Sequence, residues 1–291
     1  MRTLVTGADG FVGRHAIVRL AGAGVETVAF SGDVRDADAC RAQVREAKPD
    51  SILHLAAIAS VADAWRNPEA VSDVNVGGTR NLLTAVAEQA AHARFVLVSS
   101  AEVYGPVPEH EQPIDEETQA RPASPYAASK LEAERVALAA GLDTVIARPF
   151  PHIGPGQDER FAIASFASQI AEIERGAEPV LRVGNLDARR DICDVRDVVE
   201  AYLGLLDGTA PAGTYNVCSG RARRIGDILS SLLELAEREI EVAPDPERMR
   251  PADVPLLLGD PARIERDLGW KAGRPLQQTL SDILTSFRVR G

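Results

Sequence analysis

The chain has 291 residues, 45% of them hydrophobic, and a formal net charge of -11 at neutral pH. A chain of this size can bury a full core, as one large domain or two adjacent ones. The acidic balance argues against a nucleic acid as partner, because a phosphate backbone attracts basic patches. Three widely spaced cysteines indicate buried free thiols in a reducing compartment. The chain starts on a strand and has no uninterrupted apolar run of about 18 residues, so we expect a cytoplasmic protein that does not cross a membrane.

The first expected element is a strand over residues 2–6, followed by a glycine-rich loop and a helix that ends near Gly22. This is the context that a dinucleotide pyrophosphate requires, because glycines let the backbone approach and a helix N-terminus offers free N–H groups. The spacing Gly-x-x-Gly-x-x-Gly at this position predicts a nucleotide site. We expect its cofactor-binding residues to be Gly7, Gly10, Phe11, Val12 and Gly13.

The next elements follow each other unusually closely. A second strand is expected over residues 27–30, a helix over 37–47, and a third strand over 51–54. A strand and a helix that usually stand between the second and third of these elements in a dinucleotide-binding fold are missing from this sequence.

Asp33 and Val34 lie in the segment affected by this shortening. Asp33 follows the glycine loop by about twenty residues, where an acid can meet the adenosine ribose. Because a strand is missing, Asp33 is alternatively the acid that follows the third strand and lies beside the adenine. Both assignments stay open, and so does the choice between NAD and NADP. No basic residue ends the second strand, which leaves Arg14 and Arg35 as candidates for binding a 2′-phosphate.

The third strand ends at His54, which we expect to pack at the strand end rather than to catalyse. The residues after it are small enough for a nicotinamide ribose to lie against the backbone: Leu55, Ala56 and Ala57. A long helix is expected over residues 73–90, with Asn75 near its start bonding to the backbone of a neighbouring strand. The next strand, over residues 94–98, leads to Ser99 and Ser100.

Tyr126 and Lys130 are four residues apart on a helix expected over residues 125–140, so their side chains share one face. A lysine ammonium this close favours the phenolate, and we expect it to lower the pKa of the phenol. Such a tyrosine can exchange a proton with a sugar hydroxyl or ketone. Ser100, at the end of an apolar strand, is suited to hold the same oxygen.

A buried strand is expected over residues 144–147, and after it the periodicity weakens and prolines become more frequent. We therefore expect an α/β fold with a doubly wound parallel sheet over residues 1–150, and a smaller domain made mostly of residues 151–291. Parts of the sheet return near residues 191–217. Two arginine pairs are candidates for gripping phosphate oxygens: Arg189 with Arg190, and Arg248 with Arg250.

The glycine loop, Leu55-Ala56-Ala57, Ser100-Ala101-Glu102 and Tyr126-x-x-x-Lys130 together resemble the extended short-chain dehydrogenase/reductase family, in the family's order and over nearly the whole chain. The resemblance implies a Rossmann fold and makes Ser100 the catalytic serine, Tyr126 the acid/base, and Lys130 the residue that binds the nicotinamide ribose. Glu102 stands where 4,6-dehydratases carry a base. The acid that often precedes this base is Ala101 here, so the pattern permits dehydratase chemistry without requiring it.

Segments 152–157, 183–191, 215–220, 250–251 and 268–270 resemble the GDP-mannose branch of that family, most closely its 4-keto-sugar reductases. This likeness implies a GDP-sugar substrate, with Arg190 and Arg250 at the diphosphate or ribose. The same likeness implies further substrate contacts near the guanine and the sugar: Val183, Asn185 and His152. One departure is Pro151, where the family usually has an asparagine; proline cannot donate a hydrogen bond, which leaves the exact sugar open.

The predicted reaction is reduction of the C4 ketone of a GDP-4-keto-6-deoxy-mannose-type sugar by NADPH or NADH, without a metal. Family members commonly dimerise through two helices per subunit, so a homodimer through the helices at 73–90 and 125–140 is expected. Two alternatives stay open. One is a dehydratase or epimerase that retains its nicotinamide, and the other is a nucleotide-sensing module without catalysis, because fold alone does not fix function.

Overall fold

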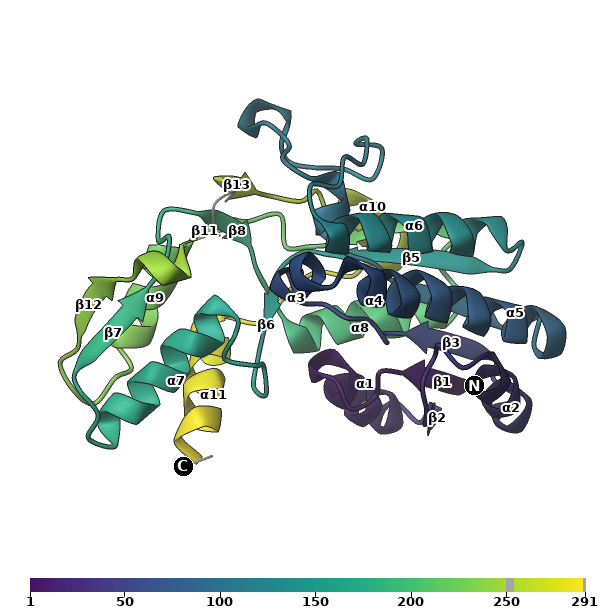
Figure 1. Cartoon of the computed structure of the whole chain (residues 1–291), viewed down its shortest axis with the longest axis horizontal. Coiled ribbons are helices and arrows are strands. Elements are labelled where there is room, and N and C mark those ends of the chain that lie inside the picture. The colour runs from purple at the N-terminus through teal and green to yellow at the C-terminus, as the bar shows by residue number, and fades with distance from the viewer. Residues whose placement is uncertain (250–253, 290–291) are drawn as a thin grey trace.

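The computed structural model describes residues 1–249 and 254–289, without the side chains of residues 61 and 62. Its main feature is a six-stranded parallel sheet in the order β10-β5-β4-β3-β1-β2 (Figure 1). The sheet is built from β1 Arg2–Thr6, β2 Glu26–Ala29, β3 Ser51–His54, β4 Arg94–Val98, β5 Thr144–Pro149 and β10 Gly213–Val217. The predicted doubly wound α/β fold is confirmed.

Helices cover both faces of this sheet, which is why its central strands are continuous apolar runs. Side chains alternate between the faces: Leu4 and Ile52 pack on one side, and Val5 and Leu53 on the other. The face of Leu4 is covered by α2 Ala37–Ala47, α5 Thr79–Gln89 and α6 Pro125–Ala139. The face of Val5 is covered by α1 Phe11–Gly22 and α8 Val195–Leu206, with α10 Ala262–Leu268 beside them.

The shortened connection predicted after β2 is present in the structure. β2 is the edge strand and α2 leads from it to β3, so the usual outer strand does not occur between these elements. β2 ends one residue earlier than expected, at Ala29, although the Phe30 N–H still donates to the Val5 carbonyl at 2.8 Å. The segment from Phe30 to Asp36 therefore leaves the edge of the sheet as a loop.

The helix expected over residues 73–90 is interrupted in its winding. It starts as the π-helical turn η1 Asp73–Gly78, continues as α5, and is preceded by α3 Val61–Arg66 and α4 Pro68–Ser72. Gly78 lies against Val34, and a Cβ there would come within 2.5 Å of the valine Cγ2. Asn75 bonds as predicted to backbone, accepting from the Ile58 N–H at 2.9 Å and donating to its carbonyl at 3.2 Å.

A second, smaller body holds its own apolar core and appears on the left of Figure 1. Three helices and a parallel strand pair enclose this core: α7 Ala162–Glu174, α9 Ile225–Leu233, α11 Leu276–Val289, β7 Val180–Val183 and β12 Glu241–Pro244. The shorter elements are β6 His152–Ile153, β8 Arg189–Asp191, β9 Cys193–Asp194, β11 Ala222–Arg224, β13 Leu256–Leu257 and the 3-10 turns η2 Ala101–Tyr104, η3 Glu109–Glu111 and η4 Pro246–Arg248.

The chain passes between the two cores several times. After β5 it enters the second core, returns for α8 and β10, leaves again for α9, returns for α10, and ends in α11. Among the segments expected near 191–217, α8 and β10 do return to the large sheet. β8 and β9 do not, because they pair with β11 and β13 and with β6 in two small sheets.

All three cysteines are free and buried, as predicted. No helix in the described part of the chain has both the length and the apolar character needed to cross a membrane.

Candidate active site

The glycine loop forms a cleft at the carboxyl end of the large sheet. Gly7 has φ +66°, and a Cβ there would lie 2.8 Å from the Ala56 nitrogen; a Cβ on Gly13 would lie 2.1 Å from the Gly7 carbonyl oxygen. Only glycine allows this close approach. Gly10 precedes α1, whose first N–H groups have no side-chain cap. The cleft of about 520 Å³ is lined by the loop from Gly7 to Gly10, by residues 30–34 and by Ala56.

Asp33 and Val34 line this cleft in the segment that follows the edge strand β2. The Asp33 carboxylate is held by Arg35, whose Nε donates at 2.8 Å and whose Nη2 donates at 2.5 Å. This hydrogen-bonded guanidinium lowers the pKa of Asp33. Arg14 lies at the glycine-loop end of the cleft, with its guanidinium donating to the carbonyls of Asp9 at 2.6 Å and Gly156 at 3.1 Å. Of the two basic candidates for a 2′-phosphate, Arg35 is therefore the one beside the Asp33 end of the cleft.

The end of β3 agrees with the expected packing role of His54. Its ring is buried between the hydroxyls of Thr6 at 2.7 Å and Thr79 at 2.9 Å. Burial lowers the pKa of His54 to about 3, so the ring is neutral at physiological pH. The next residues are half-buried and adjoin the glycine loop, since Ala56 contributes to the cleft: Leu55, Ala56 and Ala57.

Ser100 and Tyr126 meet at the carboxyl end of β4. Ser100 begins η2, and its Oγ accepts from the Glu102 N–H at 3.2 Å. Ser124 caps α6, accepting from the Ala127 N–H at 3.1 Å, and Pro125 occupies the first helical position. Tyr126 therefore sits in the first turn of α6, where the Ser100 side chain is near enough to act on the phenol and to oppose the rise in its pKa. The structure brings these two predicted residues together.

Lys130 lies one turn further along α6, buried, with its Nζ donating to the Val98 carbonyl at 2.7 Å. The expectation that Lys130 lowers the pKa of Tyr126 is wrong for this structure. Burial raises the pKa of Tyr126 to about 12, opposed by the Ser100 side chain and increased by the charge of Glu102. Burial likewise lowers the pKa of Lys130 to about 8. Desolvation of both groups outweighs their closeness on the helix, which the spacing alone did not reveal.

Glu102 is exposed at the mouth of the site, on η2. Its charge acts on the Tyr126 phenol, so the two side chains share the same electrostatic environment. Ala101 beside it is buried in a small apolar cluster with Tyr104 and Phe150. A carboxylate in place of Ala101 would have to be desolvated there.

The segment after Pro151 closes against the start of α1. The rings of His152 and Phe11 stack at a centroid distance of 6.1 Å, and the His15 ring contacts the Pro155 carbonyl at 2.8 Å. His152 also bonds the Phe150 carbonyl at 3.0 Å, and burial lowers its pKa. Val12, by contrast, packs against the core of the large sheet. The predicted residues Phe11 and His152 thus lie together between the glycine loop and the second core.

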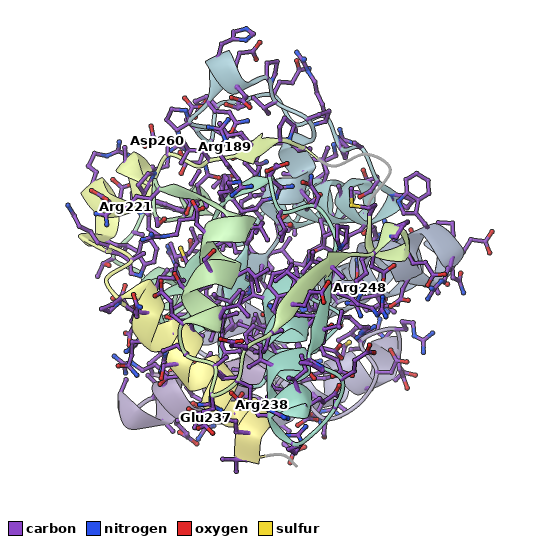
Figure 2. All side chains as sticks on the ribbon, turned by 90° about the vertical axis from the view of Figure 1, so that its left-hand side faces the viewer. Arg189, Arg221, Glu237, Arg238, Arg248 and Asp260 are labelled. Atoms are coloured by element: carbon purple, nitrogen blue, oxygen red, sulfur yellow. The ribbon has the colours of Figure 1, made fainter. Side chains whose placement is uncertain are left out.

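The arginines of the second body are spread over its surface. Arg189 pairs with Glu109 at 2.6 Å, whereas Arg248 pairs with Asp245 at 3.3 Å and donates to the Ser165 hydroxyl at 3.0 Å. Figure 2 shows Arg189 and Arg248 well apart on this face. The two predicted pairs are therefore separate features. Arg250 lies outside the described residues.

Three further residues were predicted to bind substrate from this body. Val183 is only 2% exposed and packs in the second core, so the structure gives its side chain a packing role. Asn185 is half-buried, and its Oδ1 accepts from the Asp187 N–H at 2.9 Å. Arg190 is half-buried and donates to the Arg189 carbonyl at 2.9 Å.

The sequence reasoning missed a buried ionic cluster behind Lys130. Glu134 accepts from Arg148 through two hydrogen bonds, of 3.0 and 2.6 Å, and also accepts from the Ser99 hydroxyl. The available signal was the spacing of Tyr126, Lys130 and Glu134, each four residues apart and so on one helix face. Within residues 1–249 and 254–289, no group of His, Cys, Asp and Glu is arranged to hold a metal ion.

Comparison with known proteins identifies relatives of this chain. A family model described as GDP-mannose 4,6 dehydratase matches residues 26–283. The GDP-6-deoxy-D-mannose reductase of Pseudomonas aeruginosa is 39% identical over 298 residues, covering 99% of this chain and 98% of that enzyme. A GDP-mannose 4,6-dehydratase of Vibrio cholerae is 29% identical over 290 residues, covering 88% of this chain and 77% of the relative.

Two solved structures are similar over their whole length. The structure of RMD from Pseudomonas aeruginosa complexed with NADPH has a TM-score of 0.93 and 38% identity, covering 100% of this chain and 99% of that one. The Thermus thermophilus UDP-glucose 4-epimerase in complex with NAD has a TM-score of 0.87 and 30% identity, covering 99% of both chains.

Proposed function

Because the chain belongs to the GDP-mannose 4,6-dehydratase family of extended short-chain dehydrogenases/reductases, we propose that it reduces the C4 ketone of a GDP-4-keto-6-deoxy-mannose-type sugar. The product is a GDP-rhamnose-type sugar. The observation that carries the proposal is that Ser100 lies near Tyr126 and buried Lys130, at the sheet edge that also holds the dinucleotide cleft. The whole-length likeness to a GDP-6-deoxy-D-mannose reductase supports this substrate class.

The cleft fits a nicotinamide dinucleotide, because its glycine loop has no room for side chains and opens onto an uncapped helix N-terminus. In the proposal, the residues from Gly7 to Gly13 hold the pyrophosphate. Asp33 and Val34 hold the adenosine, while the end of β3 and Lys130 hold the nicotinamide ribose. The bound cofactor, NADPH or NADH, supplies the hydride that reduces C4. The likeness to a chain complexed with NADPH supports the cofactor class.

Tyr126 supplies the proton that the developing C4 alkoxide takes up. A phenol with a pKa near 12 is protonated at neutral pH, which is the form that a reduction consumes. Ser100, near the same hydroxyl, positions the substrate oxygen for this transfer. The Lys130 ammonium contributes positive charge near the oxygen on which negative charge develops.

The GDP group is proposed to lie against the second body, with Arg190 at the diphosphate and Asn185 near the base. A half-buried arginine can grip phosphate oxygens with several donors at once. We divide the chain into two units. Residues 1–150 together with α8 and β10 form the dinucleotide-binding unit, and most of residues 151–291 form the sugar-nucleotide-binding unit. A cytoplasmic homodimer that buries the faces of η1–α5 and α6 completes the proposal.

The proposal is tested by adding GDP-4-keto-6-deoxy-mannose to the pure protein and following the absorbance of NADPH or NADH. Stoichiometric oxidation of one nucleotide, with a reduced sugar as product, is the expected result, and the faster nucleotide is the preferred cofactor. Conversion of GDP-mannose to the keto sugar without added cofactor, and without net oxidation, would contradict it.

A dehydratase is the second candidate, because Glu102 lies exposed at the site mouth with its charge acting on Tyr126. A dehydratase needs a base there to remove a sugar proton. Replacing Glu102 by Gln would then cost about 100-fold or more in turnover of GDP-mannose. In a reductase the same variant keeps most of its NADPH oxidation rate, so the two functions separate on one substitution.

A further inference from the structure

Helix α6 carries three functional groups in a single stripe. Tyr126, Lys130 and Glu134 follow each other at intervals of four residues, and all three are buried, at 8%, 5% and 2% exposure. Residues at this spacing lie one above the other on a helix. Tyr126 and Lys130 belong to the proposed reaction, whereas Glu134 lies one turn deeper.

The Glu134 carboxylate is held from two other elements. Arg148 on β5 donates to both of its oxygens, at 3.0 and 2.6 Å, and the Ser99 hydroxyl at the end of β4 donates to one of them. Arg148 is itself only 8% exposed and lies 4.8 Å above the Tyr104 ring. The carboxylate therefore has a fixed position directly behind Ser100.

The surroundings of Lys130 contain one compensating charge. From β3 the ring of His54 faces it and is neutral; from β4 the Val98 carbonyl accepts a hydrogen bond from its Nζ at 2.7 Å. From η2, Glu102 is solvent-exposed, and from β5 the Arg148 guanidinium is paired with the Glu134 carboxylate. The charge of Glu134, on the same helix, is the one that favours the protonated amine against the cost of burial.

We propose that Glu134 is a positioning residue whose carboxylate, fixed by Arg148 and Ser99, keeps the buried Lys130 in its ammonium form beside the proton donor Tyr126. The inference rests on the proposed function for its catalytic consequence, but the charge state of Lys130 is measurable without any substrate. A buried ammonium without a nearby carboxylate would lose its proton, because desolvation disfavours the charged form. With a neutral Lys130, the site would lack the charge that stabilises a developing alkoxide.

The composition of the chain makes this measurable, because Lys130 is one of only three lysines, with Lys48 and Lys271. In the full-length protein labelled with 13C-lysine, NMR gives one Cε signal per lysine. The variants K48R and K271R assign the signals. A pH titration of the wild type is expected to show Lys130 with a midpoint near 8.

One substitution at Glu134 removes the charge and another keeps it. In E134Q the favouring charge is lost, so the Lys130 midpoint falls by about one pH unit or more, a tenfold change in proton affinity. In E134D, which keeps the carboxylate, the midpoint stays closer to the wild-type value than in E134Q. A purely structural role would give the two variants the same midpoint or leave both unchanged.

An unchanged midpoint in E134Q, or equal falls in E134Q and E134D, would overturn the proposal. If E134Q does not fold, E134D still decides, because a fall of about one pH unit or more with the carboxylate kept contradicts it. The kinetic readout is the alkaline limb of kcat for NADPH oxidation, which should follow the Lys130 midpoint in each variant. A wild type without turnover would refute the reductase function, while the NMR titration would still test Glu134.

Discussion

Helix α6 and the second body hold their charged groups in opposite ways. On the side of α6, Lys130, Glu134 and Arg148 are buried and satisfied by fixed partners. On the side of the second body, Arg189 and Arg248 are exposed, and each pairs with a nearby carboxylate. A buried pair is costly to disturb, whereas an exposed arginine exchanges partners at little cost.

This difference fits two parts of the proposed function, proton transfer and binding of the sugar nucleotide. Proton transfer needs groups held in one geometry before the substrate arrives, so a rigid, desolvated set is suited to it. Binding a sugar nucleotide needs cations that can leave a carboxylate and take up phosphate oxygens, which exposed or half-buried arginines allow. The contrast can be tested on activity, stability and substrate affinity.

The largest expected effect on activity comes from the buried groups of α6. Tyr126→Phe removes the proton donor and is expected to lower kcat by about 100- to 10,000-fold. Because the aromatic ring and its packing remain, the dissociation constant for NADPH, followed by fluorescence titration, should change by no more than about threefold. A variant that keeps near-normal turnover would show that another group supplies the proton.

The second effect compares two ion pairs by their contribution to stability. Arg148→Leu leaves the Glu134 carboxylate buried without its guanidinium and should lower the free energy of unfolding by about 3–5 kcal/mol. Arg189→Leu breaks an exposed pair and should change it by less than about 1 kcal/mol. Urea unfolding of both variants under the same conditions is the measurement. Similar losses in the two would erase the distinction between the two sides.

The smallest effect is expected for the arginines of the second body. Arg190→Gln removes a cation proposed to hold the diphosphate and should raise KM for the GDP-sugar by about tenfold, with kcat within about twofold. Arg224→Gln is the matched control, because Arg224 lies on the neighbouring strand β11 and pairs with Asp187 at 2.6 Å. Steady-state kinetics with varied substrate decides. An equal rise in KM for the control would point to general charge, not to Arg190.

The large sheet was predictable because its signals are local. Apolar strands between glycine and polar turns gave residues 2–6, 51–54 and 94–98 with the observed bounds. The helix over residues 37–47 was equally clear, since Asp36 caps it by accepting from the N–H groups of Asp38 and Ala39. Even the missing outer strand could be inferred, because the distance along the chain leaves no room for it.

The remaining features depend on contacts that the sequence does not display. The strand over Arg189–Asp191 is short and charged, and its partners β11 and β13, which place it outside the large sheet, are visible only in the structure. Val183 matches a segment expected near the base, but its side chain is buried in the second core. The pKa of Tyr126 depends on how completely the tertiary structure excludes water, which helical spacing cannot give.

The repeated passage of the chain between its two cores has a consequence for any attempt to cut it. No single break separates one core from the other, because α8, β10 and α10 return to the large sheet and α11 closes the smaller core near the end of the chain. A gene fragment ending near residue 150 would lack α8 and β10, and so would expose the apolar face that they cover. The two cores must therefore be encoded, synthesised and folded together in one chain.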